Sequence, residues 1–206
     1  MSDLPIVLDP PLAATLSAAL DVEGKIVRAL DELGPIGGRD VVLVGGGPDE
    51  ERRLVEAGGR LTVVEPFDRD RGERWSPPDH SADAIVAAWS AFRGVDTTEL
   101  AEADRVLRPD GRLLVLHDYG RDDVSRLRGE RPEYSDWSRR DGPFLGAGFR
   151  IRVLHCFWSF ETLEMARAFL AEAFGESGRL FGVGLKRARL SYNVALYHRT
   201  RGGLAS

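Results

Sequence analysis

Hydrophobic and polar positions follow two kinds of pattern along this chain. Six short runs, apolar or alternating apolar and polar, lie at residues 41–44, 61–64, 84–88, 113–116, 151–156 and 192–196. Three segments repeat apolar residues every three or four positions, near residues 22–33, 97–107 and 163–173, and a fourth helical segment begins at Pro48 and ends before Gly58 and Gly59. The first pattern predicts strands and the second predicts helices. Because the two alternate, we expect an α/β fold with a mostly parallel sheet, formed as one domain over residues 1–206.

Local signals predict where several elements begin and end. Pro48 suits the first turn of a helix, because its φ angle is fixed and its missing N–H is not needed there. Thr97 or Thr98 is expected to cap the next helix. Residues 109–111, Pro-Asp-Gly, predict a turn before the strand at 113–116, and Gly175 is expected to end the last helix.

A glycine-rich turn follows the first predicted strand. Residues 45–47 are all glycine, and the second strand ends at Glu65, which can accept hydrogen bonds from ribose hydroxyls. Glu50 stands where the dinucleotide fingerprint requires a third glycine. Asp49, Glu50 and Glu51 would also repel a pyrophosphate at the helix N-terminus. The turn therefore favours a nucleoside without phosphates, above all one that carries positive charge.

These segments resemble the class I S-adenosylmethionine (SAM)-dependent methyltransferases over roughly residues 22–200. The resemblance rests on VVLVGGGPDE (41–50), LTVVEP (61–66), ADAIVAAWSAF (82–92), GAGFRIRVLHC (146–156) and residues 190–198. The most specific match is ELAEADRVLRPDGRLLVLHDYG (99–120), which holds the family's helix, R-V-L-[KR]-P-[GD]-G turn and fifth strand in order. The resemblance implies a doubly wound, Rossmann-like methyltransferase fold with one antiparallel strand. It also implies SAM as cofactor, held by Gly45, Gly46, Gly47 and Glu65.

The chain departs from the family pattern at three places. Leu43 stands where the family often has an acid, and Asp49 replaces a loop glycine. Only residues 66–82 separate Glu65 from the next core strand, too few for the helix and strand that the family places there. We therefore expect six strands, with the edge strand of the family order 3-2-1-4-5-7-6 missing. Phe67 and the 66–80 segment are expected to replace the lost adenine loop.

The shortening also predicts an exposed strand edge. Without its outer neighbour, the strand at 61–64 must be covered by residues 66–80 or by a second copy of the chain. The second arrangement would give a homodimer.

Candidate catalytic side chains follow the predicted strands, at the sheet edge where open α/β sheets bind ligands. His117 is the first choice for a base or an acceptor-positioning residue, and Asp118 could orient it or bind substrate. Trp89, Tyr119 and His155 are candidates for the wall of an acceptor pocket. Structural roles, hydrogen bonding for the histidines and core packing for the aromatic residues, remain open as alternatives.

Three functions follow as hypotheses. The first is a SAM-dependent methyltransferase acting on a small-molecule acceptor. The second is a protein of the same fold without catalysis, which serves as a binding or assembly module. The third, RNA modification, rests only on the basic residues after Glu176: Arg179, Lys186, Arg187, Arg189, Arg199 and Arg201. A net charge of −5 weighs against general nucleic-acid binding.

Composition excludes several other classes. No apolar run approaches the ~20 residues of a membrane-spanning helix, and the N-terminus carries acids and prolines unlike a signal peptide. Cys156 is the only cysteine and cannot form an internal disulfide, and no Cys/His cluster predicts a metal site. We expect a cytoplasmic protein without a membrane partner.

Overall fold

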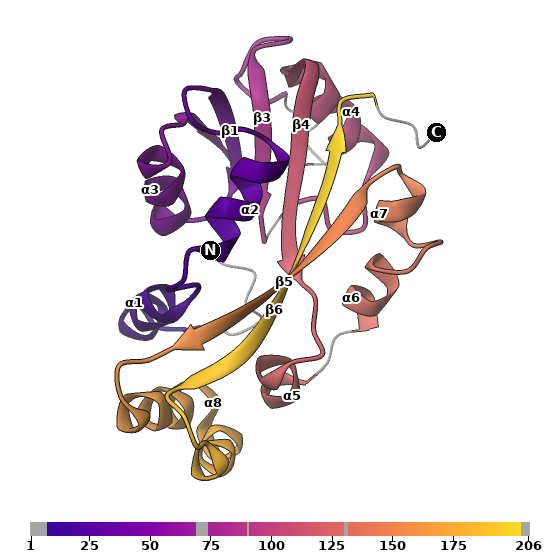
Figure 1. Cartoon of the computed structure of the whole chain (residues 1–206). Coiled ribbons are helices and arrows are strands. Elements are labelled where there is room, and N and C mark those ends of the chain that lie inside the picture. Colours follow the sequence, from indigo (N-terminus) through magenta and orange to yellow (C-terminus); the bar gives the residue numbers. More distant parts are fainter. Residues whose placement is uncertain (1–7, 69–73, 90, 130–131, 203–206) are drawn as a thin grey trace.

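The computed structural model describes residues 8–68, 74–89, 91–129 and 132–202 of the chain. Within them, six strands form one sheet in the order β2-β1-β3-β4-β6-β5 (Figure 1). The strands are β1 (Asp40–Gly45), β2 (Arg60–Val64), β3 (Ala82–Ala88), β4 (Leu107–Asp118), β5 (Arg150–Ser159) and β6 (Arg189–Thr200). The pairs β1–β2, β1–β3 and β3–β4 are parallel, whereas β6 runs antiparallel to both β4 and β5. The expected α/β fold with one antiparallel strand is confirmed.

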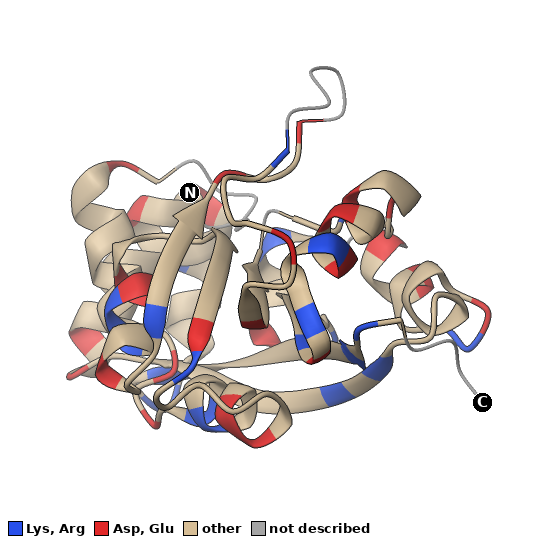
Figure 2. Cartoon of the chain, turned by 90° about the horizontal axis from the view of Figure 1, so that it is seen from above, with Lys and Arg blue, Asp and Glu red and all other residues tan. Residues whose placement is uncertain are grey.

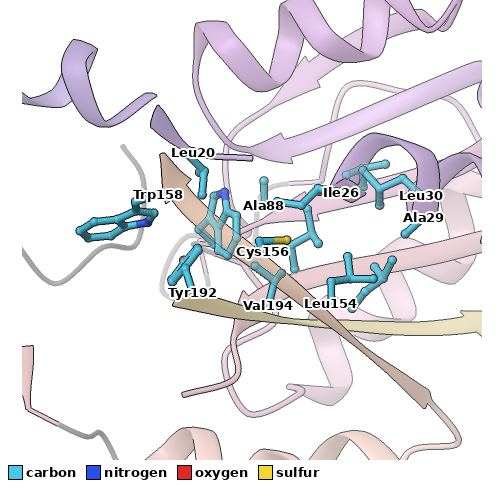
Figure 3. Packing of buried hydrophobic residues seen from close by; sticks show 14 of the residues in the cluster. Leu20, Ile26, Ala29, Leu30, Ala88, Leu154, Cys156, Trp158, Tyr192 and Val194 are labelled. Carbon is cyan, nitrogen blue, oxygen red and sulfur yellow. The ribbon is translucent and has the colours of Figure 1, made fainter. Parts of the chain in front are cut away.

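Both faces of the central strands β1 and β3 are buried, because successive side chains point alternately into two cores. Leu43 of β1 pairs in register with Val86 of β3 and belongs to one core, while Val42 and Ile85 belong to the other. The first face packs against α1 (Pro10–Ala19), α2 (Lys25–Leu33), α3 (Pro48–Glu56) and α8 (Leu163–Gly184). The second face packs against α4 (Thr97–Val106), α6 (Pro132–Trp137) and α7 (Pro143–Gly146). Figure 3 shows part of the first core, where Cys156 lies near Ile26 and Trp158 lies on the side of Tyr192.

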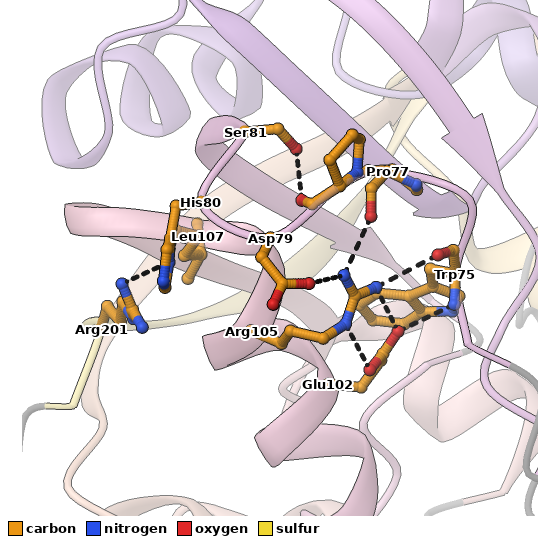
Figure 4. Close-up of polar contacts among 10 residues, drawn as sticks. Trp75, Pro77, Asp79, His80, Ser81, Glu102, Arg105, Leu107 and Arg201 are labelled. Atoms are coloured by element: carbon orange, nitrogen blue, oxygen red, sulfur yellow. Dashed lines mark hydrogen bonds and ion pairs between the residues drawn. The ribbon is translucent and has the colours of Figure 1, made fainter.

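Strand β2 is the edge of the described sheet, as the shortened sequence predicts. Arg105 of α4 holds the chain that leads from β2 to β3 (Figure 4). Its guanidinium donates to the carbonyl oxygens of Trp75 and Pro77, both at 3.1 Å, and pairs with Asp79 at 2.6 Å. The described residues 74–81 of this connection therefore lie on α4 and do not pair with β2, and an open groove of about 740 Å³ separates them from β2 residues such as Thr62.

The structure corrects three local predictions. Asp96, not Thr97 or Thr98, caps α4, since its carboxylate accepts the backbone N–H of Thr98 at 2.8 Å. Residues 109–111 form no separate turn but a bulge inside β4, where the pairing passes from Ala82–Leu107 to Ala84–Arg112.

The last predicted helix does not simply end at Gly175. That residue adopts a φ of 57° and breaks α8 into two helical stretches. The second stretch packs back on the first so closely that a Cβ on Gly178 would lie 1.8 Å from the backbone oxygen of Leu170.

Helix α1 is missing from the sequence prediction, although the sequence carries its signals. Asp9 caps the helix by accepting the N–H of Leu12 at 3.0 Å, and two prolines, Pro10 and Pro11, follow. A short connection, α5 (Asp123–Arg128), follows β4 at the carboxyl edge of the sheet.

Candidate functional site

The glycine turn lies where β1 ends, between β2 and β3. Gly45 and Gly46 adopt φ angles of 66° and 80°, in the left-handed region that glycine tolerates best. A Cβ on Gly46 would lie 3.4 Å from Leu43 and 3.5 Å from the Ala88 side chain, so the turn packs closely on its neighbours. Gly47 is extended and precedes the first residue of α3.

Glu50 folds back over this turn and fills the α3 N-terminus. Its Oε2 accepts the backbone N–H of Gly47 at 3.0 Å, and its Oε1 accepts the indole N–H of Trp89 at 3.3 Å. Sequence reasoning missed this role, although Glu at the third helical position is typical of a capping box. The N–H group of the N-cap residue Gly47 is therefore already bound by a carboxylate of the chain itself.

Helix α1 covers the same place from outside. The Ser17 hydroxyl donates to the carboxylate of Asp49, and this bond is the main reason why the pKa of Asp49 is lowered. The guanidinium of Arg53 donates to the backbone oxygen of Leu20 at 2.9 Å. Beneath these contacts remains a cavity of about 20 Å³, lined in part by Leu20, Glu50 and Trp89. That space suits about one water molecule.

Glu65 and Phe67 lie in a different, open place. They line a groove of about 420 Å³ at the end of β2, together with Trp75. The rings of Phe67 and Trp75 meet edge to face with centroids 6.4 Å apart, and the Trp75 indole donates to the backbone oxygen of Glu65 at 3.1 Å. The Glu65 side chain is exposed. The groove falls in the size range of small-molecule sites, roughly 300–1,000 Å³.

His117 lies inside the second core rather than at an open edge. It is 1% exposed, and its ring centroid lies 4.7 Å from that of Trp137 and 5.9 Å from that of Phe144. Burial, helped by the positive charge of Arg93, lowers the pKa of His117 to about 3. Its ring nitrogens make no hydrogen bond within the described chain. His117 is therefore neutral near pH 7 and walled off from solvent.

Asp118 forms a buried ion pair instead of orienting His117. Its carboxylate lies 2.5 Å from the guanidinium of Arg128, and both side chains are 4% exposed. The Tyr192 hydroxyl donates to the same carboxylate. Burial disfavours the charge on Arg128, but the attraction of Asp118 outweighs it and raises the pKa of Arg128. Burial beside Asp118 also raises the pKa of Tyr192.

The three residues predicted to line an acceptor pocket lie apart. Trp89 is buried in the first core, where its ring packs 6.2 Å from that of Tyr192. Tyr119 packs against the second core. His155 is exposed on β5, and its Nδ1 lies 2.8 Å from the Asn193 side-chain oxygen.

Known proteins resemble this chain in structure but not in sequence. No protein-family model and no curated protein sequence matches it. A candidate type II methyltransferase from Anaeromyxobacter dehalogenans superimposes with a TM-score of 0.55 at 19% identity, over 85% of this chain and 94% of that one. A candidate methyltransferase from Bacillus halodurans C-125 gives 0.51 at 13% identity, over 87% and 100% of the chains. A SAM-dependent methyltransferase from Aquifex aeolicus gives 0.50 at 19% identity, over 92% and 93%.

The chain has a methyltransferase fold. Its sheet keeps the order expected for that fold once the family edge strand is removed. The groove beside Glu65 and Phe67 measures about 420 Å³, whereas the space at Glu50 and Trp89 holds about one water molecule.

Three of the basic C-terminal residues make contacts within the fold. Arg179 pairs with Glu176 at 2.7 Å, and Arg199 pairs with Asp104 of α4. The Arg189 guanidinium lies 4.4 Å from the Phe157 ring centroid. Figure 2 shows basic and acidic residues interspersed over the molecule.

Metal clusters and membrane-spanning helices are absent from the described part of the chain. No group of three or more His, Cys, Asp or Glu side chains there is placed to hold a metal ion. Among the described helices, none is long and apolar enough to cross a membrane. Cys156 is a free, buried thiol whose pKa burial raises to about 12.

Proposed function

We propose that this chain is a SAM-dependent methyltransferase acting on a small-molecule acceptor. One observation carries the proposal: the glycine turn and Glu65 end neighbouring parallel strands, paired in register through Val44 and Val64, so one ligand can reach both. In open α/β sheets, this carboxyl edge is where ligands bind.

The nucleoside half of the cofactor is assigned to the groove at the end of β2. The exposed Glu65 carboxylate would accept hydrogen bonds from the two ribose hydroxyls, and charge makes such bonds strong. Phe67 and Trp75 offer aromatic surface to the base. Gly45 and Gly46 let the ligand approach the backbone.

The acids of α3 suit a cationic ligand. Asp49, Glu50 and Glu51 all lie in its first turn. When bound, SAM supplies a methyl group on a positively charged sulfur. The negative potential of these three side chains favours that charge.

His117 and Asp118 are proposed to shape the site from within the fold. His117 packs among aromatic rings below the carboxyl edge, and Asp118 ties the end of β4 to Arg128 and Tyr192. Because both side chains are buried, we assign them a positioning role rather than contact with the acceptor.

Calorimetry with S-adenosylhomocysteine tests this function. The wild-type chain is expected to give saturable heat, and Glu65→Gln is expected to weaken binding by about tenfold or more, because a charged hydrogen bond contributes about 1.5–3 kcal/mol. Glu172→Gln, which neutralises an exposed carboxylate on α8, serves as the matched control and should bind like wild type. Absence of heat at high-micromolar protein would overturn the proposal.

A second candidate is an assembly module without catalysis, favoured by the open edge of β2. Within the described chain, β2 pairs on one side only, and Val63 is 46% exposed. Antiparallel pairing with a second copy can set Arg60 of one strand opposite Glu65 of the other, which joins opposite charges. This candidate predicts a stable dimer that binds no cofactor.

A further inference from the structure

We propose that Glu50 and Trp89 determine which part of a ligand the site admits. They fill the place of the amino-acid half, so the chain as folded recognises the nucleoside half alone. The inference rests on the proposed function and assigns ligand selectivity within that same site.

Glu50 competes directly with a ligand carboxylate. Its Oε2 lies 3.0 Å from the Gly47 nitrogen, so the N–H that an incoming carboxylate would use at the start of α3 is already bound. A second carboxylate there would also meet the charges of Asp49 and Glu51. Like charges repel one another strongly near a partly buried surface.

Trp89 closes the same space with its ring. The residue has a φ of 64°, which is unusual for a non-glycine residue, and its backbone N–H donates to the Leu116 oxygen at 3.0 Å. The ring is 4% exposed, lines the 20 Å³ cavity, and donates its indole N–H to Glu50. Admitting an amino-acid group therefore requires Trp89 and Glu50 to separate.

Helix α1 packs against α3 and covers the small cavity that Glu50 and Trp89 line. Leu20 lines the cavity, while the Ser17–Asp49 and Arg53–Leu20 hydrogen bonds fasten the end of α1 to α3. The groove beside Glu65 has no such cover and keeps about 420 Å³. Because the space at Glu50 and Trp89 is closed while the groove beside Glu65 is open, we assign the ligand selectivity to Glu50 and Trp89.

The test compares adenosine with S-adenosylhomocysteine by calorimetry on the full chain. In wild type, the two ligands should bind within about threefold of each other. In Glu50→Gln and in Trp89→Phe, which keeps an aromatic ring but loses the indole N–H, S-adenosylhomocysteine should gain about tenfold while adenosine is unchanged. Glu172→Gln neutralises an exposed carboxylate on α8, outside the proposed site, and should leave the ratio of the two affinities near the wild-type value.

The outcomes separate the two proposals. A wild-type chain that binds S-adenosylhomocysteine at least about tenfold tighter than adenosine overturns the selectivity inference and leaves the proposed function standing. Equal effects of Glu50→Gln on both ligands also overturn the inference. Binding of neither ligand overturns the proposed function, and the selectivity inference fails with it. Thermal unfolding of each variant, followed by circular dichroism, identifies any variant that has not folded, and the remaining variant then decides.

Discussion

Arg105 binds the carboxylate of Glu102, one turn earlier on α4, through Nε at 2.9 Å and Nη2 at 2.6 Å. The same Glu102 carboxylate accepts the backbone N–H of Trp75 at 2.8 Å. The hydrogen bond and charge of Arg105 hold the pKa of Glu102 below its usual range. The pair thus anchors the shortened connection between β2 and β3, where related folds place a helix and a strand.

Replacing Arg105 by alanine should destabilise the fold, because it leaves the carboxylate of Glu102 unpaired in a mostly buried place. We expect a loss of about 3 kcal/mol in the free energy of unfolding, measured with urea. Arg139→Ala removes an exposed ion pair with Asp141 and should cost less than about 1 kcal/mol. Equal losses in the two variants would contradict the anchoring role.

Gly178 should tolerate no side chain. Its Cβ would lie 1.8 Å from the Leu170 oxygen, so Gly178→Ala must push apart the two stretches of α8. The expected cost is about 2 kcal/mol or more in unfolding free energy. Gly184→Ala, where the new Cβ meets nothing within 4 Å, should change stability by no more than about 0.5 kcal/mol. If both variants unfold at the wild-type urea concentration, the close packing is wrong.

Stability should fall as the pH drops from 6.5 toward 3, because His117 stays neutral in the folded protein and is protonated in the unfolded chain. Because unfolding takes up one proton, the free energy of unfolding should change by about 1.4 kcal/mol per pH unit in this range. His117→Phe should flatten this slope, measured by urea unfolding between pH 4.5 and 6.5. His198 also has a lowered pKa but is only half-buried, so His198→Gln should flatten it less. An unchanged slope in His117→Phe would count against the buried, neutral imidazole.

Pairing of two β2 edges predicts a dimer in solution. Val63→Lys adds a charge to the exposed edge and should give a monomer by light scattering. Val22→Lys changes a valine that is also exposed, at 65%, but lies outside the sheet, and should leave the dimer intact. A monomeric wild-type chain at high-micromolar concentration would rule out this association.

The sheet could be predicted from sequence because its signals are local and repeated. Apolar runs at 41–44, 84–88 and 113–116 place β1, β3 and β4. The lost edge strand follows from counting residues after Glu65. The N-cap of α4 could not be predicted from sequence alone, because Asp96 and Thr97 are both residue types favoured at that position.

The site was harder to predict, because side-chain direction depends on contacts between distant elements. His117 and Asp118 are neighbours at the end of β4, but alternation along the strand sends His117 among α6 and α7 while Asp118 turns to Arg128 and Tyr192. The bond between Glu50 and Trp89 joins residues 39 positions apart. Spacing along the chain predicts neither the side-chain directions of His117 and Asp118 nor the bond between Glu50 and Trp89.

Hydrogen exchange of backbone amides with and without S-adenosylhomocysteine locates the bound ligand as well as detecting it. We predict that protection on binding concentrates at the end of β2, around Glu65 and Phe67, with a smaller change at the glycine turn. Glu65→Gln should reduce that protection at the same ligand concentration. Protection confined to the α1–α3 side of the molecule, or no protection at saturating ligand, would contradict the proposed methyltransferase site.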